Sequence, residues 1–285
     1  MLALLVALMA LAPCDCVAFR LDDIQDYYDR DAQMAVIRLF RDYNATLTAG
    51  VIGGALGHDG ELVRFLQDNR GRVELANHGW LHEDFSALPA QEQARLLGQT
   101  GSKMEELFGA RPVTFIAPFN RLNGGTAEAA SSNGLKIISA DLERQPPSFD
   151  GARQIWHLPV NANVSDYDEE KMYWQSFDNG VVLSDIESGL ERDGYAMVML
   201  HPRDFVDEEH RVDPLKMGEL AALIEEVRSR GLKVVTVSEI ADINNSSNVR
   251  ATPDLQTTAL AGGASAAAVF YLTRRIKGRK DRHPL

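Results

Sequence analysis

The sequence of 285 residues has few cysteines and no excess of positive charge, and each shortage excludes a class of protein. Its two cysteines, Cys14 and Cys16, stand one residue apart, and neighbours this close rarely reach disulfide geometry. We therefore expect no disulfide in the body of the protein. The formal net charge is −12, and the basic run lies at the carboxyl terminus. A nucleic-acid-binding protein would need a basic face, so this class is excluded.

The hydrophobic content is 45%, arranged in short apolar runs that alternate with helical patterns. Strands alternating with helices predict an α/β fold with a parallel sheet, either open and doubly wound or a barrel. About eight strands without a Gly-x-Gly-x-x-Gly after the first one favour a barrel. The predicted strands are Val17–Leu21, Ala45–Ile52, Val73–Asn77, Val113–Ala117, Lys136–Ser139, Ile155–Val160, Ala196–His201 and Lys233–Val237, and the predicted helices include Asp29–Tyr43, Glu61–Asn69, Pro89–Phe108 and Pro214–Ser229.

The first residues are almost wholly apolar, which indicates a secretory signal segment over residues 1–16. Because a basic n-region is missing, a buried first strand or helix and a misplaced start codon stay open. The catalytic domain is expected over residues 17–243.

The other end of the chain is also segmented by composition. Residues 244–257 are polar and without period, and predict a linker. Residues 258–273 carry no charge and precede a basic tail at 274–285, which predicts a carboxyl-terminal transmembrane anchor. A flexible Ala/Gly tail is the alternative. With the signal segment, the anchor predicts an extracytoplasmic domain at the cell surface or anchored to its membrane.

Two groups of polar residues come directly after predicted strands, where parallel α/β folds place their active sites. Asp22 and Asp23 close the first strand, although such a pair can simply start a loop. His78 and His82 follow the strand that ends at Asn77, and at this spacing two imidazoles on one helical turn can hold one metal ion. With a carboxylate they would complete a site of two histidines and one acid.

Two further strand ends carry candidate residues. The segment Ile116-Ala117-Pro118-Phe119 follows one strand, and Met199-Leu200-His201 ends another. A histidine at this position can act as a general acid, although a lone one is more often structural.

In this order the motifs resemble those of the polysaccharide deacetylase family, whose NodB homology domain defines carbohydrate esterase family 4. The family's T-F-D-D, H-[S/T]-x-x-H, R-x-P-[Y/F], Asp-containing segment and L-x-H stand here as Arg20-Leu21-Asp22-Asp23, His78 to His82, Ile116 to Phe119, Asp141 and Met199-Leu200-His201. The resemblance covers residues 17–243. It implies a distorted, incomplete (β/α) barrel of about seven strands.

The resemblance also implies roles. Asp22 would be the general base, and His201 the general acid, with Asp141 as the acid that tunes it. The metal ligands would be Asp23, His78 and His82, and the backbone N–H of Phe119 would bind the oxyanion. Zn²⁺ is the expected ion, with Co²⁺ or another transition metal as alternatives.

The sequence departs from the family at several positions. The third-motif arginine, which pairs with the base, aligns with Ile116, and either Arg20 or Arg121 could supply its charge. Gly79 replaces Ser/Thr, and Met199 replaces Leu. These changes leave base, acid and ligands intact and suggest a divergent branch of the family.

The expected activity is removal of acetyl groups from an N-acetylated glycan by a metal-dependent hydrolase. Candidate substrate contacts are Pro118, Trp80 and Met199, and Trp174 and Tyr173 are further aromatic residues that could stack on sugars. The alternatives are a C–N hydrolase of small amides on the same fold, and a non-catalytic carbohydrate-binding envelope protein.

Overall fold

The computed structural model describes residues 14–140, 146–168 and 173–251, and it contains every predicted strand and helix with small changes at the ends. The strands are β1 (Cys16–Ile24), β2 (Leu47–Val51), β3 (Val73–Asn77), β4 (Thr114–Ile116), β5 (Ile137–Ser139), β6 (Ser148–Asp150), β7 (Ile155–His157), β8 (Ala162–Asn163), β9 (Ser165–Asp168), β10 (Tyr173–Ser176), β11 (Ala196–Leu200) and β12 (Lys233–Val235). The helices are α1 (Arg30–Asp42), α2 (Gly60–Asn69), α3 (Ala90–Phe108), α4 (Thr126–Ser132), α5 (Asn179–Asp193), α6 (Pro214–Ser229) and α7 (Val237–Ala251), with 3-10 turns η1 (Gly53–Ala55), η2 (Phe85–Ala87), η3 (Pro118–Asn120) and η4 (Pro202–Phe205).

Ten strands form one sheet in the order β6-β7-β5-β4-β3-β2-β1-β11-β8, with β12 beside the start of β1. All neighbours in it are parallel except β6 and β7, so the predicted α/β class is confirmed. The carboxyl ends of parallel strands meet at one edge. Asp23 near the end of β1, His78 after β3 and His201 after β11 therefore come to the same edge.

The sheet curls upon itself as a distorted barrel. The Arg20 guanidinium on β1 donates to the Ser139 hydroxyl on β5 at 2.8 Å, although β2, β3 and β4 separate these strands in the sheet. Strands β7 and β8 do not pair with each other, so the barrel is open between them, and the segment that joins them crosses this opening. Leu158 N–H bonds to β5, and Asn161 N–H bonds to β11. The sheet has ten strands, where the resemblance implied about seven, and the short strands β6 and β8 are the two that the sequence did not predict.

Strand β1 shows how the two faces of this sheet divide. Alternate side chains of a strand point to opposite faces. Val17, Phe19 and Leu21 pack on the outer core under the helices, whereas Cys16 and Ala18 belong to an inner cluster with residues of β5, β7 and β11. Continuing the alternation, Arg20 and Asp22 face inward.

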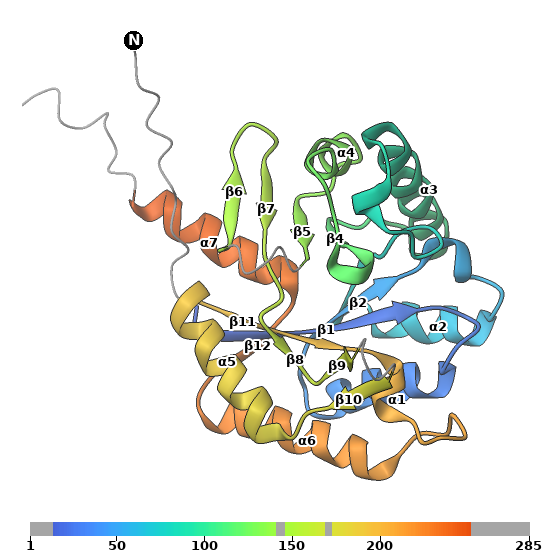
Figure 1. The fold of residues 1–285 in the computed structure, drawn as a ribbon, viewed down its shortest axis with the longest axis vertical. Helices are drawn as coiled ribbons and strands as arrows, with labels where there is room; N and C mark the ends of the chain where they lie inside the picture. The colour runs from blue at the N-terminus through green and yellow to red at the C-terminus, as the bar shows by residue number, and fades with distance from the viewer. Residues whose placement is uncertain (1–13, 141–145, 169–172, 252–285) are drawn as a thin grey trace, which may run out of the picture. The chain divides into compact units, whose positions relative to one another are not determined.

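Helices α1 to α6 lie around the outside of the sheet (Figure 1). Helix α1 buries Val36, Ile37 and Phe40 at helical spacing against this outer core. Phe40 meets Phe19 edge-on, with ring centroids 5.1 Å apart.

Helix α7 contacts the inner side. Val237 and Ile240 join the inner cluster, and the half-buried Glu74 carboxylate accepts hydrogen bonds from Ser238 N–H and the Thr48 and Thr114 hydroxyls. A carboxylate at the first turn of a helix is favoured by the free N–H groups there. This network satisfies polar side chains inside an otherwise apolar interior.

The predicted boundaries of the domain need correction at both ends. Residues 244–251, expected to begin the linker, continue helix α7, and Asn244 is buried with its amide bonded to Ile240. Contacts define a compact unit of residues 1–247 and a second unit of 248–285, of which the end of α7 is described. At the amino end, Cys16 already belongs to β1 and is fully buried, so the packed domain begins before residue 17.

The predicted anchor at 258–273, the basic tail and residues 1–13 of the signal segment lie outside the described residues. Within the described part of the chain, the helices are all too short or too polar to cross a bilayer.

The expectation that the two cysteines stay unpaired was wrong. Cys14 and Cys16 form a disulfide, with Cα atoms 5.1 Å apart. Asp15 between them has φ 46°, and this left-handed turn brings the two Cα atoms into the range that a disulfide requires.

The aromatic pair under α1 generates a prediction. Replacing Phe40 by Ala leaves a cavity beside Phe19, and we expect the free energy of unfolding to fall by about 3–5 kcal/mol in denaturant titrations. Leu215, 79% exposed on α6, is the control, and its replacement by Ala should cost less than about 0.5 kcal/mol. Equal effects of both substitutions would contradict this description of the core.

Candidate active site

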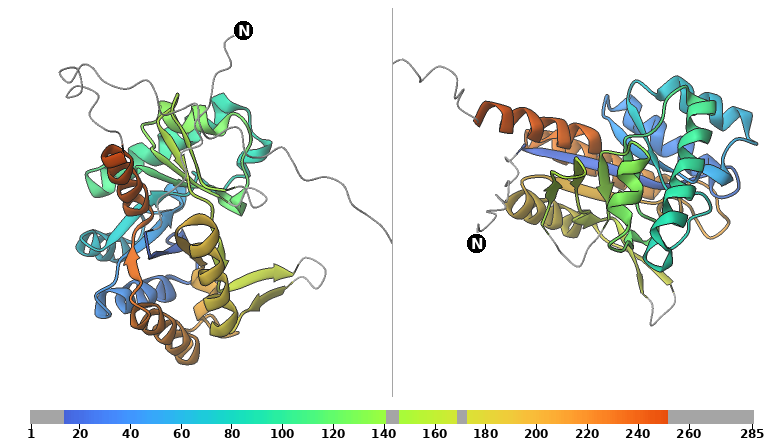
Figure 2. Two further views of the ribbon diagram at one scale, coloured as in Figure 1. Left: turned by 90° about the vertical axis from the view of Figure 1, so that its left-hand side faces the viewer. Right: turned by 90° about the horizontal axis from the view of Figure 1, so that it is seen from above.

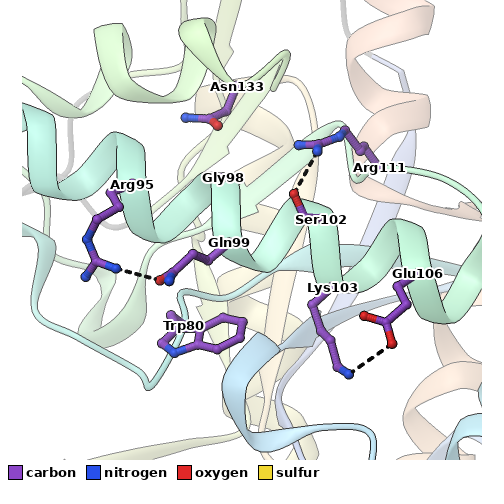
Figure 3. Close-up of a pocket in the computed structure, with 9 residues that line it drawn as sticks. All are labelled: Trp80, Arg95, Gly98, Gln99, Ser102, Lys103, Glu106, Arg111 and Asn133. Carbon is purple, nitrogen blue, oxygen red and sulfur yellow. Dashed lines mark hydrogen bonds and ion pairs between the residues drawn. The ribbon is translucent and has the colours of Figure 1, made fainter.

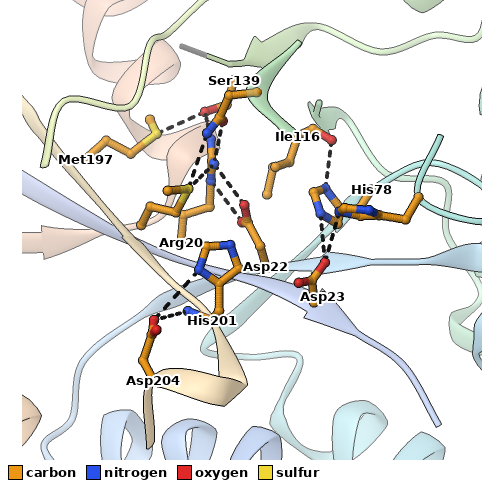
Figure 4. Close-up of polar contacts among 12 residues, drawn as sticks. Arg20, Asp22, Asp23, His78, Ile116, Ser139, Met197, His201 and Asp204 are labelled. Carbon is orange, nitrogen blue, oxygen red and sulfur yellow. Dashed lines mark hydrogen bonds and ion pairs between the residues drawn. The ribbon is translucent and has the colours of Figure 1, made fainter. Parts of the chain in front are cut away.

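Asp23, His78 and His82 converge at the carboxyl edge of the sheet (Figure 4 shows Asp23 and His78). Their ligand atoms all lie within 4.8 Å of one another. The Nε2 atoms of His78 and His82 stand 3.3 and 3.2 Å from the same oxygen, Asp23 Oδ1. The sequence placed these three residues together, and the structure does the same.

The loop after β3 fixes the two histidines, but it is not the helical turn that we expected. His78 Nδ1 bonds to the Ile116 carbonyl at 2.9 Å, which leaves Nε2 directed at Asp23. His82 has a left-handed backbone, with φ 64°, and this conformation turns its ring toward His78. The centroids of the two imidazole rings lie 5.0 Å apart. Two imidazoles four residues apart thus meet without a helix.

Gly79 accounts for one departure from the family pattern. Its φ is 77°, and a Cβ there would lie 3.1 Å from Glu83 Oε2. Glu83 in turn accepts the N–H groups of Trp80 and Leu81, so its carboxylate is held inside the loop. The loop therefore favours glycine, where the family has a small hydroxyl residue.

The donor set fits a divalent transition metal. Asp23 Oδ1 is buried and has no hydrogen-bond donor of acceptable geometry, which is unusual for a carboxylate oxygen unless a cation meets it. Each imidazole offers Nε2, and His78 is oriented by a backbone carbonyl in the way that metal-bound histidines are. Burial alone would raise the pKa of Asp23, but its contacts with His78 and His82 lower this pKa far below its usual range.

Arg20 supplies the charge that the third motif lacks. It is fully buried, and its Nε and Nη2 donate to the two oxygens of Asp22 at 2.9 and 2.8 Å (Figure 4). The rest of the guanidinium is also satisfied, by Ser139 Oγ, Asn120 Oδ1 and Met199 Sδ. Arg121, the other candidate, has a side chain 60% exposed and lies 3.5 Å from Asp84.

The sequence contained a signal for this pair. Residues two apart on a strand share a face, so Arg20 and Asp22 had to be neighbours once β1 was assigned. The replacement of the family's Thr by Arg20 and of its Arg by Ile116 is therefore a relocation of one charge from β4 to β1.

His201 begins the turn after β11, and its acidic neighbour among the described residues is Asp204. Asp204 Oδ2 accepts the His201 backbone N–H at 2.7 Å and lies 3.8 Å from Nδ1. Ser165 Oγ donates to the other oxygen at 2.6 Å and orients the carboxylate. Asp141, the predicted partner, lies outside the described residues.

The protonation of His201 follows from these neighbours. Burial of the ring disfavours its charged form, but the carboxylates of Asp204 and Asp22 outweigh burial and raise the pKa of His201. A histidine held protonated in this way is suited to donate a proton.

A cleft of about 550 Å³ opens over these groups. One wall is the hairpin β9–β10, which stands out from the body of the domain (Figure 2). Trp174 on this hairpin lies 5.2 Å from the His201 ring, between centroids. The lining residues are Asp22, Asp23, His78, His82, Phe119, Asn120, Arg121, Asp166, Tyr167, Trp174, Met199, His201 and Arg203.

Some of the other predicted cleft residues line the cleft, and others do not. Met199 and Phe119 line the cleft, and the Phe119 ring packs 4.5 Å from His82 with its backbone in the left-handed region at φ 56°. Pro118 is buried and stays out of the lining. Trp80 was a wrong choice, because it lines a separate groove along α3 with Arg95 and other residues (Figure 3).

The two arginines make a matched test of the relocated charge. Arg20→Met leaves Asp22 buried without its cation, and we expect the free energy of unfolding to fall by about 3–5 kcal/mol. Arg121→Met removes an exposed ion pair and should cost less than about 1 kcal/mol. Denaturant titrations at neutral pH measure both. If Arg121→Met proved the more destabilising change, Arg20 would not be the partner of Asp22.

Comparison with known proteins agrees with this geometry. Residues 11–138 match the sequence model of the family described as polysaccharide deacetylase. A curated relative, the peptidoglycan deacetylase-like protein FGM2 of Gibberella zeae, is 36% identical over 63 residues, which cover 22% of this chain and 19% of that protein. The chain thus spans a small part of this relative.

Solved structures share the fold. A proposed polysaccharide deacetylase from Mycobacterium smegmatis has a TM-score of 0.64 at 20% identity, covering 85% of this chain and 96% of that one. A family 4 acetyl xylan esterase from Clostridium thermocellum, in complex with a cobalt ion, has a TM-score of 0.55 at 17% identity. The match covers 81% of this chain and 95% of that one. A family 4 pseudoenzyme from Bacillus anthracis has a TM-score of 0.55 at 13% identity. The match covers 80% of this chain and 66% of that one.

The chain therefore matches the polysaccharide deacetylase family over residues 11–138, and it shares the fold of the solved family 4 structures.

Proposed function

We propose that the protein is a metal-dependent hydrolase that removes acetyl groups from an N-acetylated carbohydrate polymer. The observation that carries this proposal is the arrangement around one cleft: three convergent metal ligands, with Asp22 and His201 lining the same space. A carboxylate base, a protonated histidine and a metal site are groups that together suit metal-dependent amide hydrolysis.

The proposed metal ligands are Asp23, His78 and His82, and Zn²⁺ or Co²⁺ suits such a donor set. The family 4 relative from Clostridium thermocellum was solved with a cobalt ion. When bound, such an ion lowers the pKa of a water molecule and polarises an acetamide carbonyl.

The residues of the chain itself perform the proton transfers. Asp22, held in place by Arg20, takes a proton from the attacking water. The Phe119 N–H, in the turn that forms one side of the cleft, is the proposed donor to the oxyanion. His201 then gives its proton to the leaving nitrogen, so that the free amine departs as the C–N bond breaks.

An inert binding protein is the rival function, and the family 4 pseudoenzyme shows that this fold can carry it. The missing third-motif arginine was the feature in its favour. Since Arg20 makes a bidentate pair with Asp22, the base keeps its cation in this chain. The intact pair favours an active enzyme.

The proposed location is outside the cytoplasm, which the apolar amino terminus first suggested. The disulfide between Cys14 and Cys16 supports it, because disulfides persist mainly in oxidising compartments. A glycan polymer is found there, whereas the alternative substrates, small amides, are more typical of the cytoplasm.

Separate losses of metal and of base test the proposal. His78→Ala should weaken zinc binding by at least about 100-fold in calorimetry and abolish acetate release from N-acetylglucosamine oligomers. Asp22→Asn should keep zinc yet lower acetate release by about 10²–10⁴-fold. His58→Ala, an exposed histidine, is the control for both assays. Acetate release that survives Asp22→Asn, or that occurs only from small amides, would refute the proposal.

The pH dependence tests His201. A general acid works while protonated, so its raised pKa extends activity toward higher pH before the alkaline decline. Asp204→Asn removes the main carboxylate that raises this pKa, and the alkaline limb of kcat/KM should move to lower pH. Glu209→Gln, exposed on the following loop, should leave the limb in place. An unchanged limb in Asp204→Asn would show that His201 is not the acid.

A further inference from the structure

Arg203 is a cation of the cleft that has no carboxylate partner among the residues that the structure describes. It lies in turn η4, two residues after His201, and lines the cleft. Its guanidinium carbon stands 4.5 Å above the centre of the Trp174 ring. This cation–π contact is its one interaction with the described residues, so its N–H donors have no protein acceptor there.

Other arginines without a carboxylate partner in the described part of the chain, such as Arg38 and Arg64, are exposed, whereas Arg203 lines the cleft. The chain has 41 acidic residues against 29 basic ones, and neighbouring surface arginines such as Arg211 and Arg230 each pair with two carboxylates. Arg203 is also partly buried, which makes donors without acceptors costly. A group from outside the chain would compensate this cost.

Asp166, the acidic residue of the same wall, does not fill this place. On the hairpin it pairs with Gln175, whereas Trp174 pairs with Tyr167. Asp166 also lines the cleft, but no ion pair joins it to Arg203, and neighbouring residues of a strand point to opposite faces, so Asp166 and the Trp174 ring lie on opposite faces of the hairpin. Its Oδ1 accepts the Tyr167 N–H instead.

Apart from Asp166, the other charged residues of the cleft have partners of their own. Asp22 is paired with Arg20, His201 with Asp204, and Arg121 lies 3.5 Å from Asp84. Asp23 and its two histidines are the proposed metal site. Arg203 therefore remains as a positive site, beside the ring that stacks near the general acid.

We infer that Arg203 and Trp174 form a carboxylate-binding subsite, and that the substrate is an acidic N-acetylated glycan. The indole face would carry a sugar ring, and the guanidinium would take a carboxylate of that sugar or its neighbour through two N–H donors. The carboxylate would lie on the His201 side of the scissile acetamide. This inference rests on the proposed deacetylase function and names its substrate class.

A pair of substrates that differ in one charge tests the subsite. The probes are an oligosaccharide of alternating uronic acid and N-acetylglucosamine, and its carboxyl methyl ester. With the zinc-loaded full chain, kcat/KM for acetate release should be at least about tenfold higher for the acid, mainly through a lower KM. In Arg203→Gln the ratio of kcat/KM for the acid to that for the ester should fall to about one. Arg203→Lys should retain part of this preference, because a single ammonium group replaces a bidentate guanidinium.

Arg41→Gln is the matched control, an exposed arginine on α1 whose loss should leave the ratio unchanged. Equal kcat/KM of the wild type for acid and ester would overturn the subsite while leaving the deacetylase function intact. If neither probe releases acetate, the deacetylase function fails, and calorimetric binding of the same two probes then tests the subsite alone. Preferential binding of the acid that Arg203→Gln abolishes would uphold it, and equal binding of acid and ester would overturn it.

Discussion

The buried pair of Arg20 and Asp22 is the interaction on which the rest of this site depends. Two charges inside a barrel are costly to desolvate, and they are tolerated only when every donor and acceptor is satisfied. Here Ser139 on β5, Asn120 after β4 and Met199 on β11 complete the guanidinium shell. The Arg20 side chain thus connects three distant parts of the curled sheet to β1. It also fixes the orientation of the Asp22 carboxylate, which we assign as the base.

Around this pair the site is organised so that each group assigned to the chemistry has its own partner. Asp23 faces two imidazoles, and His201 has Asp204, itself oriented by Ser165. Because each of these groups has a partner beside it, the proposed acid, base and metal ligands can lie in one cleft and each keep the protonation state that its role requires. The backbone contributes as well, since the left-handed residues Asp23 and His82 aim side chains that regular structure would point elsewhere.

Chemistry and substrate choice come from different parts of the fold. The chemical groups lie on or directly after strands of the parallel sheet, where packing from both sides holds them. The wall of the cleft comes from the hairpin β9–β10 and from turn η4, which stand outside this sheet. Changes in the hairpin or the turn can therefore alter the glycan that is bound without disturbing base, acid or metal ligands.

The sequence by itself determined the α/β class, the order of the main strands and helices, and the residues Asp22, Asp23, His78, His82 and His201. These follow from local periodicity and from motifs that lie at strand ends. Only the tertiary structure decided between Arg20 and Arg121, put Asp204 beside His201, placed Trp174 and not Trp80 at the cleft, and joined Cys14 to Cys16. The physical reason is that these outcomes depend on close contacts and on a single left-handed residue, neither of which a hydrophobic pattern encodes. Ser139, which holds Arg20, is 119 residues away in the chain, and only the curl of the sheet brings the two together.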